Sequence, residues 1–261
     1  NTKKSMPTLN APSEPIAANS AANHDAVRPV KITSAKPTLR QRVVAYASIA
    51  RPDHWLKNVF MLIGVVLAFF YKPDLFVGFH WVNLLLGFAA TCLVASSNYV
   101  INEILDAPTD ANHPEKHNRP IPSGLVSLPW AYVEWLVIGA VGFGLAWMVN
   151  LPFFAAAVSL WIMGLIYNVR PVRSKELPYV DVLSESINNP IRLALGWFVV
   201  SAVTIPPVSL LVSYWMVGAF FMAAKRFAEY RMIGAKARAA AYRSSFPHYD
   251  DNRPLLRLVV Y

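Results

Sequence analysis

The chain has little cysteine, little charge and few acidic side chains. Cys92 is the single cysteine among 261 residues, so disulfide bonds cannot hold the fold together. Charged residues make up only 15% of the sequence and apolar residues 55%, whereas a water-soluble domain normally carries about 25% charged residues. Walker sequences, glycine-rich phosphate loops and Ser/His/Asp arrangements are also missing, which argues against P-loop enzymes and serine hydrolases.

Long apolar runs are abundant instead. Trp81–Ile101 has 21 residues without a charged side chain, enough to cross a bilayer core of about 30 Å as a helix. The runs are apolar at odd and even positions alike, which predicts helices rather than the alternating strands of a membrane barrel. We therefore predict an all-α, polytopic transmembrane helix bundle. Its six candidate spans are Trp55–Tyr71, Trp81–Ile101, Trp130–Val149, Leu151–Tyr167, Val180–Ser201 and Val208–Ala224, and Pro254–Tyr261 resembles a seventh cut short.

The first 45 residues differ in composition from the rest. They combine Asn, Ser and Ala with five prolines and scattered charges, and such a segment buries too little apolar surface to offset the entropy lost on ordering. We predict a flexible cytoplasmic tail at 1–45 and a transmembrane domain at 46–261.

The positions of lysine and arginine predict the orientation. Nine of these residues precede or begin the first span, and twelve lie in the stretches 102–129, 168–179 and 225–253. The loops on the other side hold only Lys72, and basic residues mark the cytoplasmic side of a membrane. We predict a multi-pass protein of the inner (cytoplasmic) membrane with its N-terminus in the cytoplasm.

A polar pattern follows the end of the second predicted span. Asn98, Asn102, Asp106 and Asp110 recur at steps of four, which puts the first three on one helix face, while Pro108 bends or ends that helix. Carboxylate and amide oxygens suit Mg²⁺, which is commonly held by one or two carboxylates together with substrate phosphate oxygens. Solvated acids at a helix end are the plainer alternative, but the full spacing favours a magnesium site.

A second polar stripe lies in the predicted span Val180–Ser201. Asp181, Glu185, Asn188 and Arg192 follow one another at steps of four, three and four along one helix face. Arg192 would sit about two turns into the membrane, where a guanidinium needs a partner or a polar cavity. Two interpretations stay open: Arg192 belongs to a site, or it pairs with Glu185 and fastens neighbouring helices.

Basic side chains lie in the loops between the two patterns. Arg119, Arg170, Arg173 and Lys175 are placed to hold phosphate oxygens, for which arginine offers bidentate geometry and lysine a point charge. Together with a metal ion, these cations predict a phosphorylated ligand. The later stretch 225–231, Lys-Arg-x-x-Glu-Tyr-Arg, favours a basic surface helix near anionic lipid, with a lid over the site as the alternative.

The two patterns resemble the paired aspartate-rich motifs of the UbiA superfamily of intramembrane prenyltransferases. The resemblance covers about residues 50–230 and rests on Asn102-x-x-x-Asp106-x-x-x-Asp110, Arg119-Pro-x-x-Ser-Gly124 and Lys175-x-x-Pro178-x-x-Asp181-x-x-x-Glu185. The segment Arg51-Pro-Asp-His-Trp55-Leu-Lys57-Asn58 is similar to the start of the branch that contains decaprenyl-phosphate phosphoribosyltransferases.

The resemblance implies a nine-helix bundle, of which this chain would contain about six to seven helices and lack the C-terminal ones. Its cavity would bind an isoprenoid diphosphate through Mg²⁺. By matching position, Asn102, Asp106 and Asp110 would hold one metal ion and Asp181 and Glu185 another, and these four carboxylates would be catalytic. We expect the remaining polar residues of the site to bind substrate: Arg51, Lys57, Asn98, Arg119, Arg170, Arg173, Lys175, Asn188 and Arg192.

The expected reaction is Mg²⁺-dependent transfer of a prenyl group from an isoprenoid diphosphate to an acceptor, with release of pyrophosphate. Phosphoribosyl transfer from phosphoribosyl pyrophosphate to a polyprenyl phosphate is the alternative, since both reactions break a carbon–diphosphate bond through a cation-like transition state. A non-catalytic lipid-phosphate binder is a further alternative, whereas a transporter would collect its ionisable groups near the membrane midplane. Glu185 replaces the usual final Asp of the second motif, which puts the second metal ion in question. We expect an isoprenoid lipid and the bilayer as partners, and no nucleic acid.

Overall fold

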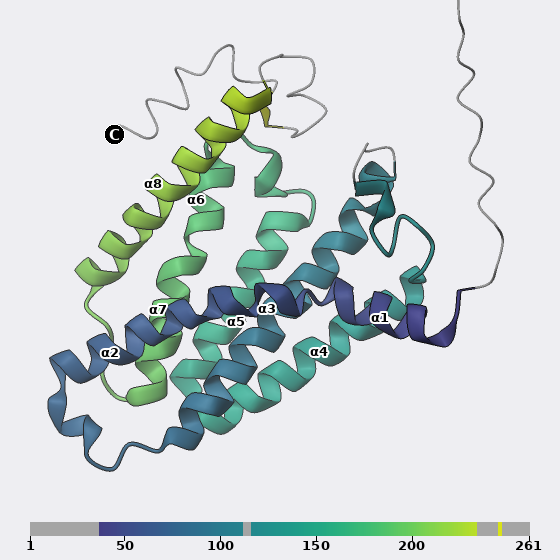
Figure 1. The fold of residues 1–261 in the computed structure, drawn as a ribbon. Helices are drawn as coiled ribbons and strands as arrows, with labels where there is room; N and C mark the ends of the chain where they lie inside the picture. The colour runs from purple at the N-terminus through teal and green to yellow at the C-terminus, as the bar shows by residue number, and fades with distance from the viewer. Residues whose placement is uncertain (1–36, 112–115, 234–244, 247–261) are drawn as a thin grey trace, which may run out of the picture. The chain divides into compact units, whose positions relative to one another are not determined.

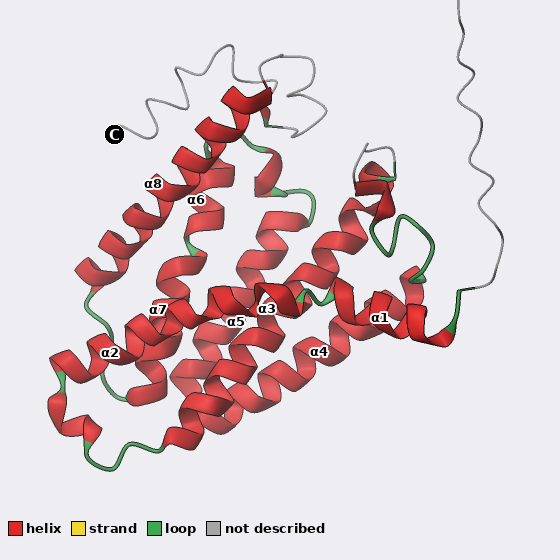
Figure 2. Cartoon of the chain, in the orientation of Figure 1, coloured by secondary structure: helices red, strands yellow, loops and turns green. Residues whose placement is uncertain are grey.

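The computed structural model describes residues 37–111, 116–233 and 245–246, which form a bundle of helices (Figure 1). No β-strand occurs in this described part of the chain, in agreement with the predicted all-α class (Figure 2). Its α-helices are α1 (Leu39–Ile49), α2 (Met61–Tyr71), α3 (Trp81–Asp110), α4 (Leu128–Val149), α5 (Leu151–Asn168), α6 (Val180–Ser186), α7 (Asn188–Val200) and α8 (Val208–Ile233). Its 3-10 helices are η1 (Pro52–Phe60), η2 (Pro73–Phe76), η3 (Lys116–Asn118) and η4 (Ser174–Glu176).

Five helical stretches are long and apolar enough to cross a membrane. Large apolar side chains on the outer faces, such as Val137, Val141 and Phe221, are exposed, and hydrocarbon is the solvent that such faces fit. The predicted spans in α3, α4, α5 and α8 agree with these stretches, and the chain is an integral, multi-pass membrane protein. The stretches are Leu39–Tyr71, Trp81–Asp110, Leu128–Val149, Leu151–Asn168 and Val208–Met232.

The folded part begins earlier than predicted. Helix α1 starts at Leu39, and Thr38 and Gln41 form a capping box at its N-terminus, so this helix lies partly within the segment 1–45 assigned to the tail. The predicted first span, Trp55–Tyr71, is likewise only the later part of a longer stretch made of α1, η1 and α2. Residues 1–36 and the predicted partial span 254–261 lie outside the described residues, so the tail and that span stay predictions.

The predicted span Val180–Ser201 is helical, but it is not one continuous helix, because the structure divides it into α6 and α7 at Ile187. Pro190 explains the break, since it has no N–H to donate to the carbonyl of Ser186 four residues earlier. Pro108, in contrast, does not end α3, which continues to Asp110. A proline in the last turn removes little helical hydrogen bonding, and the acidic pattern therefore stays on one continuous helix.

Helix α3 lies at the centre and packs against α4, α5 and α7, while α2 packs against α7. The contact between α2 and α7 is made by backbone atoms. A Cβ atom added to Gly64 would lie 1.9 Å from the carbonyl oxygen of Leu193, and one added to Gly196 would lie 1.8 Å from that of Met61. Only glycine permits this approach. It brings η1, directly before α2, next to the polar residues of α7.

Candidate active site

A polar cavity of about 510 Å³ lies where α3, α5, α6 and α7 meet η1 and α8. Asn98 and Asn102 of the first polar pattern line it, as do Glu185, Asn188 and Arg192 of the second. The two patterns, more than 80 residues apart in the sequence, therefore share one cavity. The remaining polar lining comes from Arg51, His54, Lys57, Tyr99, Tyr167, Asn168, Asn189 and Lys225.

Lys175 organises the first pattern. Its ammonium donates hydrogen bonds to Asn102 Oδ1 at 3.0 Å, to Asp106 Oδ1 at 2.6 Å and to Asn168 Oδ1 at 2.9 Å. Burial lowers the pKa of the Lys175 ammonium below its ordinary value, and the Asp106 carboxylate opposes that shift. The predicted shared face of Asn102 and Asp106 is confirmed by their common partner.

Two arginines hold the carboxylates of the first pattern. Arg173 Nη2 lies 2.9 Å from Asp106 Oδ1, so Asp106 contacts a second cation. Arg119 Nη1 lies 2.6 Å from Oδ2 of Asp110, whose residue is only 4% exposed. These charge-assisted contacts fix the positions of both carboxylates.

Arg226, on α8, organises the second pattern. It is 2% exposed, and its Nε lies 3.1 Å from Oδ2 of the fully buried Asp181. The same guanidinium donates to Glu185, and its Nη1 lies 3.1 Å from Glu229 Oε2. Glu185 also accepts a hydrogen bond from the Tyr167 hydroxyl at 3.1 Å. A basic surface helix is therefore the wrong interpretation for Arg226, which is an internal ion-pair partner.

Arg192 does not pair with Glu185. Its Nε donates to Asn58 Oδ1 at 3.0 Å, and its Nη1 donates to the carbonyl of Asn188 at 3.4 Å. Asn58, in η1, is 1% exposed and also donates through Nδ2 to Cys92 Sγ at 3.3 Å. An uncharged amide thus orients the Arg192 guanidinium, which keeps its positive charge available to the cavity.

The predicted substrate-binding residues divide into three groups. Arg51, Lys57, Asn98, Asn188 and Arg192 line the cavity. The side chains of Arg119, Arg173 and Lys175 instead hold carboxylates of the first pattern. Arg170 is exposed and does not line the cavity.

The donor set fits Mg²⁺ chemically, because both patterns offer carboxylate and amide oxygens and neither offers sulfur or imidazole. Asn98 donates through Nδ2 to the carbonyl of Leu160, while its buried Oδ1 has no hydrogen-bond partner among the described residues. The described ranges contain no close group of three or more His, Cys, Asp and Glu side chains. Each motif carboxylate contacts a Lys or Arg instead, and the predicted metal ligands stay a prediction.

Three residues of this arrangement were not among the predicted site residues: Asn58, Asn168 and Arg226. Arg226 had one visible signal, since it lies three residues before Glu229 at helical spacing, but its partners Asp181 and Glu185 are more than 40 residues away. Asn58 belongs to the segment 51–58 that resembles the phosphoribosyltransferase branch, but its partner Arg192, like the partner of Asn168, is revealed only by the packing of η1, η4 and α5 around α3 and α7.

Comparisons with known proteins agree with this architecture. Decaprenyl-phosphate phosphoribosyltransferase of Mycobacterium tuberculosis is 29% identical over 214 residues, which cover 80% of this chain and 67% of that protein. Nodulation protein NoeC of Azorhizobium caulinodans is 33% identical over 141 residues, 54% of this chain and 44% of that protein. The solved structure of a UbiA homolog from Archaeoglobus fulgidus bound to GPP and Mg²⁺ has a TM-score of 0.67 at 20% identity, over 83% of this chain and 72% of that one.

The sequence profile of the UbiA prenyltransferase family matches residues 58–249, which is more than half of the chain. Together with the helical bundle and its membrane-crossing stretches, this match means that the chain belongs to the UbiA prenyltransferase family of membrane-embedded transferases.

Proposed function

We propose that this protein transfers the phosphoribosyl group of phosphoribosyl pyrophosphate to a polyprenyl phosphate, with release of pyrophosphate. The observation that carries the proposal is one cavity lined by residues of both polar patterns and by cations. Glu185 is the one motif carboxylate in its lining, which does not include Asp106, Asp110 or Asp181. Arg51, Lys57, Arg192 and Lys225 all line it, and a substrate with three phosphate groups needs such a concentration of positive charge.

The amide side chains of the cavity favour a sugar over a prenyl chain. Five asparagines line it: Asn98, Asn102, Asn168, Asn188 and Asn189. Amides donate and accept hydrogen bonds, as ribose hydroxyls require, whereas an isoprenoid chain gains nothing from them. The similarity to decaprenyl-phosphate phosphoribosyltransferase supports the same donor.

The reaction needs charge stabilisation and no redox partner. The bond from the anomeric carbon to the diphosphate oxygen breaks, its electron pair leaves with pyrophosphate, and an oxygen of the polyprenyl phosphate forms the new bond to carbon. Cavity cations oppose the charge on the leaving group, as preorganised charges do in other transferases. Asn102, Asp106, Asp110, Asp181 and Glu185 would hold Mg²⁺, which when bound adds positive charge next to the diphosphate.

Prenyl transfer from an isoprenoid diphosphate is the second candidate. The family as a whole is named for it, and the solved homologue from Archaeoglobus fulgidus carries GPP and Mg²⁺. The same cations and acidic residues would serve that reaction, because its donor also carries a diphosphate.

For either reaction we infer that the protein lies in the inner membrane and that its cavity opens to the cytoplasm, with the N-terminus on the same side.

A comparison of two substrate pairs tests the proposal. The purified protein is incubated with Mg²⁺ and either phosphoribosyl pyrophosphate plus decaprenyl phosphate, or geranyl diphosphate plus 4-hydroxybenzoate. We expect pyrophosphate and a phosphoribosylated lipid, identified by mass spectrometry, only with the first pair, and no turnover after chelation of Mg²⁺. Product from the second pair alone supports prenyl transfer, and ligand retention without any product indicates a binding protein.

Asp106→Asn supplies the matched test of the site. Asp106 contacts Lys175 and Arg173, so loss of its charge removes the anchor of the first pattern, and we expect turnover to fall by about 100-fold or more. Asp74→Asn is the control, since Asp74 is exposed in η2, before the first residue of α3, whereas the motif is at the other end of that helix. Unchanged turnover in Asp106→Asn contradicts the proposed site.

A further inference from the structure

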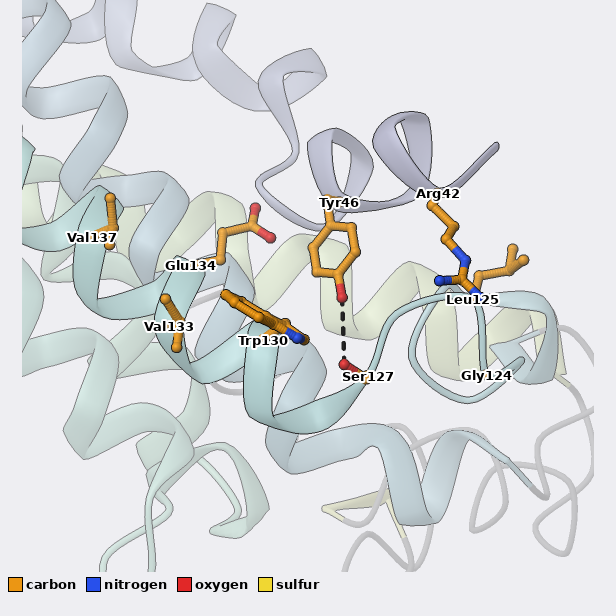
Figure 3. A pocket seen from close by; sticks show the side chains of 9 residues that line it. All are labelled: Arg42, Tyr46, Gly124, Leu125, Ser127, Trp130, Val133, Glu134 and Val137. Carbon is orange, nitrogen blue, oxygen red and sulfur yellow. Dashed lines mark hydrogen bonds between the residues drawn. The ribbon is translucent and has the colours of Figure 1, made fainter. Parts of the chain in front are cut away.

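A second cavity, of about 680 Å³, lies outside the candidate active site. It is formed by α1, the loop before α4 and the first turns of α4 (Figure 3). None of its lining residues lines the polar cavity described above. An occupant of this cavity is therefore separate from the substrates bound in the polar cavity.

Opposite charges line this second cavity. Glu134, on α4, has a buried Oε2 atom with no hydrogen-bond partner among the described residues. Glu103 lies near enough for its carboxylate to interact unfavourably with that of Glu134, an interaction that a positive charge bound at this end relieves. Arg42, on α1, lines the cavity too, and the Tyr46 hydroxyl lies 3.4 Å from Ser127 Oγ between the two helices (Figure 3). An uncompensated carboxylate in a membrane helix is costly, and a cationic ligand group removes that cost.

The rest of the wall is apolar and faces lipid. Trp130, Val133 and Val137 line the cavity and are 65%, 45% and 55% exposed on the outer face of α4. Trp130 is in the first turn of this helix, and tryptophan is typical of the level of lipid head groups. An occupant with a charged head and apolar chains fits such a wall.

We propose that this cavity binds the head group of a zwitterionic aminophospholipid of the phosphatidylethanolamine class. Its ammonium group donates hydrogen bonds to Glu134, its phosphate contacts Arg42, and its acyl chains lie along Trp130 and Val137. Phosphatidylcholine has no N–H group with which to donate a hydrogen bond to the Glu134 carboxylate that lines the cavity. Anionic lipids such as phosphatidylglycerol place no positive charge next to Glu134 and Glu103.

Native mass spectrometry of the full chain tests this site. Detergent-solubilised protein is mixed with equal amounts of palmitoyl-oleoyl phosphatidylethanolamine, phosphatidylcholine and phosphatidylglycerol, and the retained lipid is identified. We expect about tenfold more phosphatidylethanolamine than either other lipid, the ratio that one charge-assisted hydrogen bond provides. Glu134→Gln should bring the ratio of phosphatidylethanolamine to phosphatidylcholine close to one. Arg42→Gln should lower retention of both and leave their ratio unchanged.

Arg40→Gln is the matched control. It removes one positive charge from the same helix, but Arg40 lines another hollow next to α1 and does not line this cavity, so the lipid ratio should not change. Glu134→Gln conserves shape and removes no described hydrogen bond of Oε2, and circular dichroism checks that its helices are retained. The proposal is overturned if Glu134→Gln keeps the lipid preference, if the wild-type chain prefers phosphatidylglycerol, or if crosslinking from Val137→Cys shows that a second copy covers this face.

Discussion

Arg226 is the residue on which the buried charge of the second pattern most depends. Its guanidinium contacts the carboxylates of Asp181, Glu185 and Glu229, from a side chain that is 3% exposed. Three acidic partners around one cation leave this cluster with a net negative charge, which suits a place where further positive charge binds. Arginine fits here because its planar group donates in three directions at once.

Arg226→Met should destabilise the protein strongly. The substitution leaves the fully buried Asp181 carboxylate without its guanidinium, and breaking a buried ion pair costs about 3–5 kcal/mol. The free energy of unfolding, measured by denaturant titration in detergent micelles, should fall by that amount.

Lys225→Met is the control for this measurement. The Lys225 side chain is 55% exposed and its nitrogen lies 3.9 Å from Glu229, a geometry worth less than about 1 kcal/mol. Equal losses of stability in the two variants would mean that Arg226 acts through general charge rather than through its buried contacts.

Sequence spacing predicted part of the site and missed the rest for a physical reason. Asn102 and Asp106 share a helix, so a period of four was sufficient to place them on one face. Lys175 was predicted to bind phosphate, but it donates to these two side chains because the loop after α5 returns to α3. Such a return depends on the packing of whole helices, which local spacing does not encode.

At the scale of helices, apolar length predicted α3, α4, α5 and α8, because a bilayer core requires about 20 apolar residues in a row. Helix α1 was not predicted, because Arg40 and Arg42 interrupt its short apolar pattern. The division between α6 and α7 lies next to Pro190, whereas apolar length alone treats residues 180–201 as one run. Length therefore predicts which helices cross the membrane but not where a helix is divided to form a site.

The contact between α2 and α7 provides a test at this scale. Gly196→Ala places a methyl group 1.8 Å from the Met61 carbonyl oxygen, and backbone atoms cannot move aside as a flexible side chain can. We expect the free energy of unfolding to fall by about 1–3 kcal/mol or more. The proposed phosphoribosyl transfer should fall too, since separation of α2 from α7 moves Asn58 away from Arg192.

Gly144→Ala is the matched control, because a Cβ atom there meets no atom within 4 Å. Alanine in place of a helical glycine should stabilise α4 by up to about 1 kcal/mol. Unfolding in detergent, followed by circular dichroism, measures both variants. A neutral Gly196→Ala would show that the two backbones can separate without cost.

At the scale of the whole molecule, charge is divided between the two ends of the described bundle. The segments after α3 and α5 carry the basic residues Arg119, Arg173 and Lys175, whereas the turn between α2 and α3 carries Lys72 and Asp74. Loops rich in lysine and arginine stay in the cytoplasm when a membrane protein is inserted. The distribution of basic residues therefore predicts that a soluble phosphorylated donor reaches the cavity from the cytoplasm.

Cysteine labelling tests this orientation. Asp74 and Arg170 are both exposed, on opposite ends of the bundle, and the natural Cys92 is only 1% exposed, so it contributes little background. We expect a membrane-impermeant maleimide to label Asp74→Cys in intact spheroplasts and to label Arg170→Cys only after permeabilisation. The physical reason is that, in the topology predicted from the sequence, 21 of the 24 basic residues belong to segments on the side of Arg170, and Lys72 alone belongs to the loops of the other side. The reverse labelling pattern would place the cavity mouth outside the cytoplasm, where a cytoplasmic phosphoribosyl donor cannot reach it, and would contradict the proposed reaction together with the orientation.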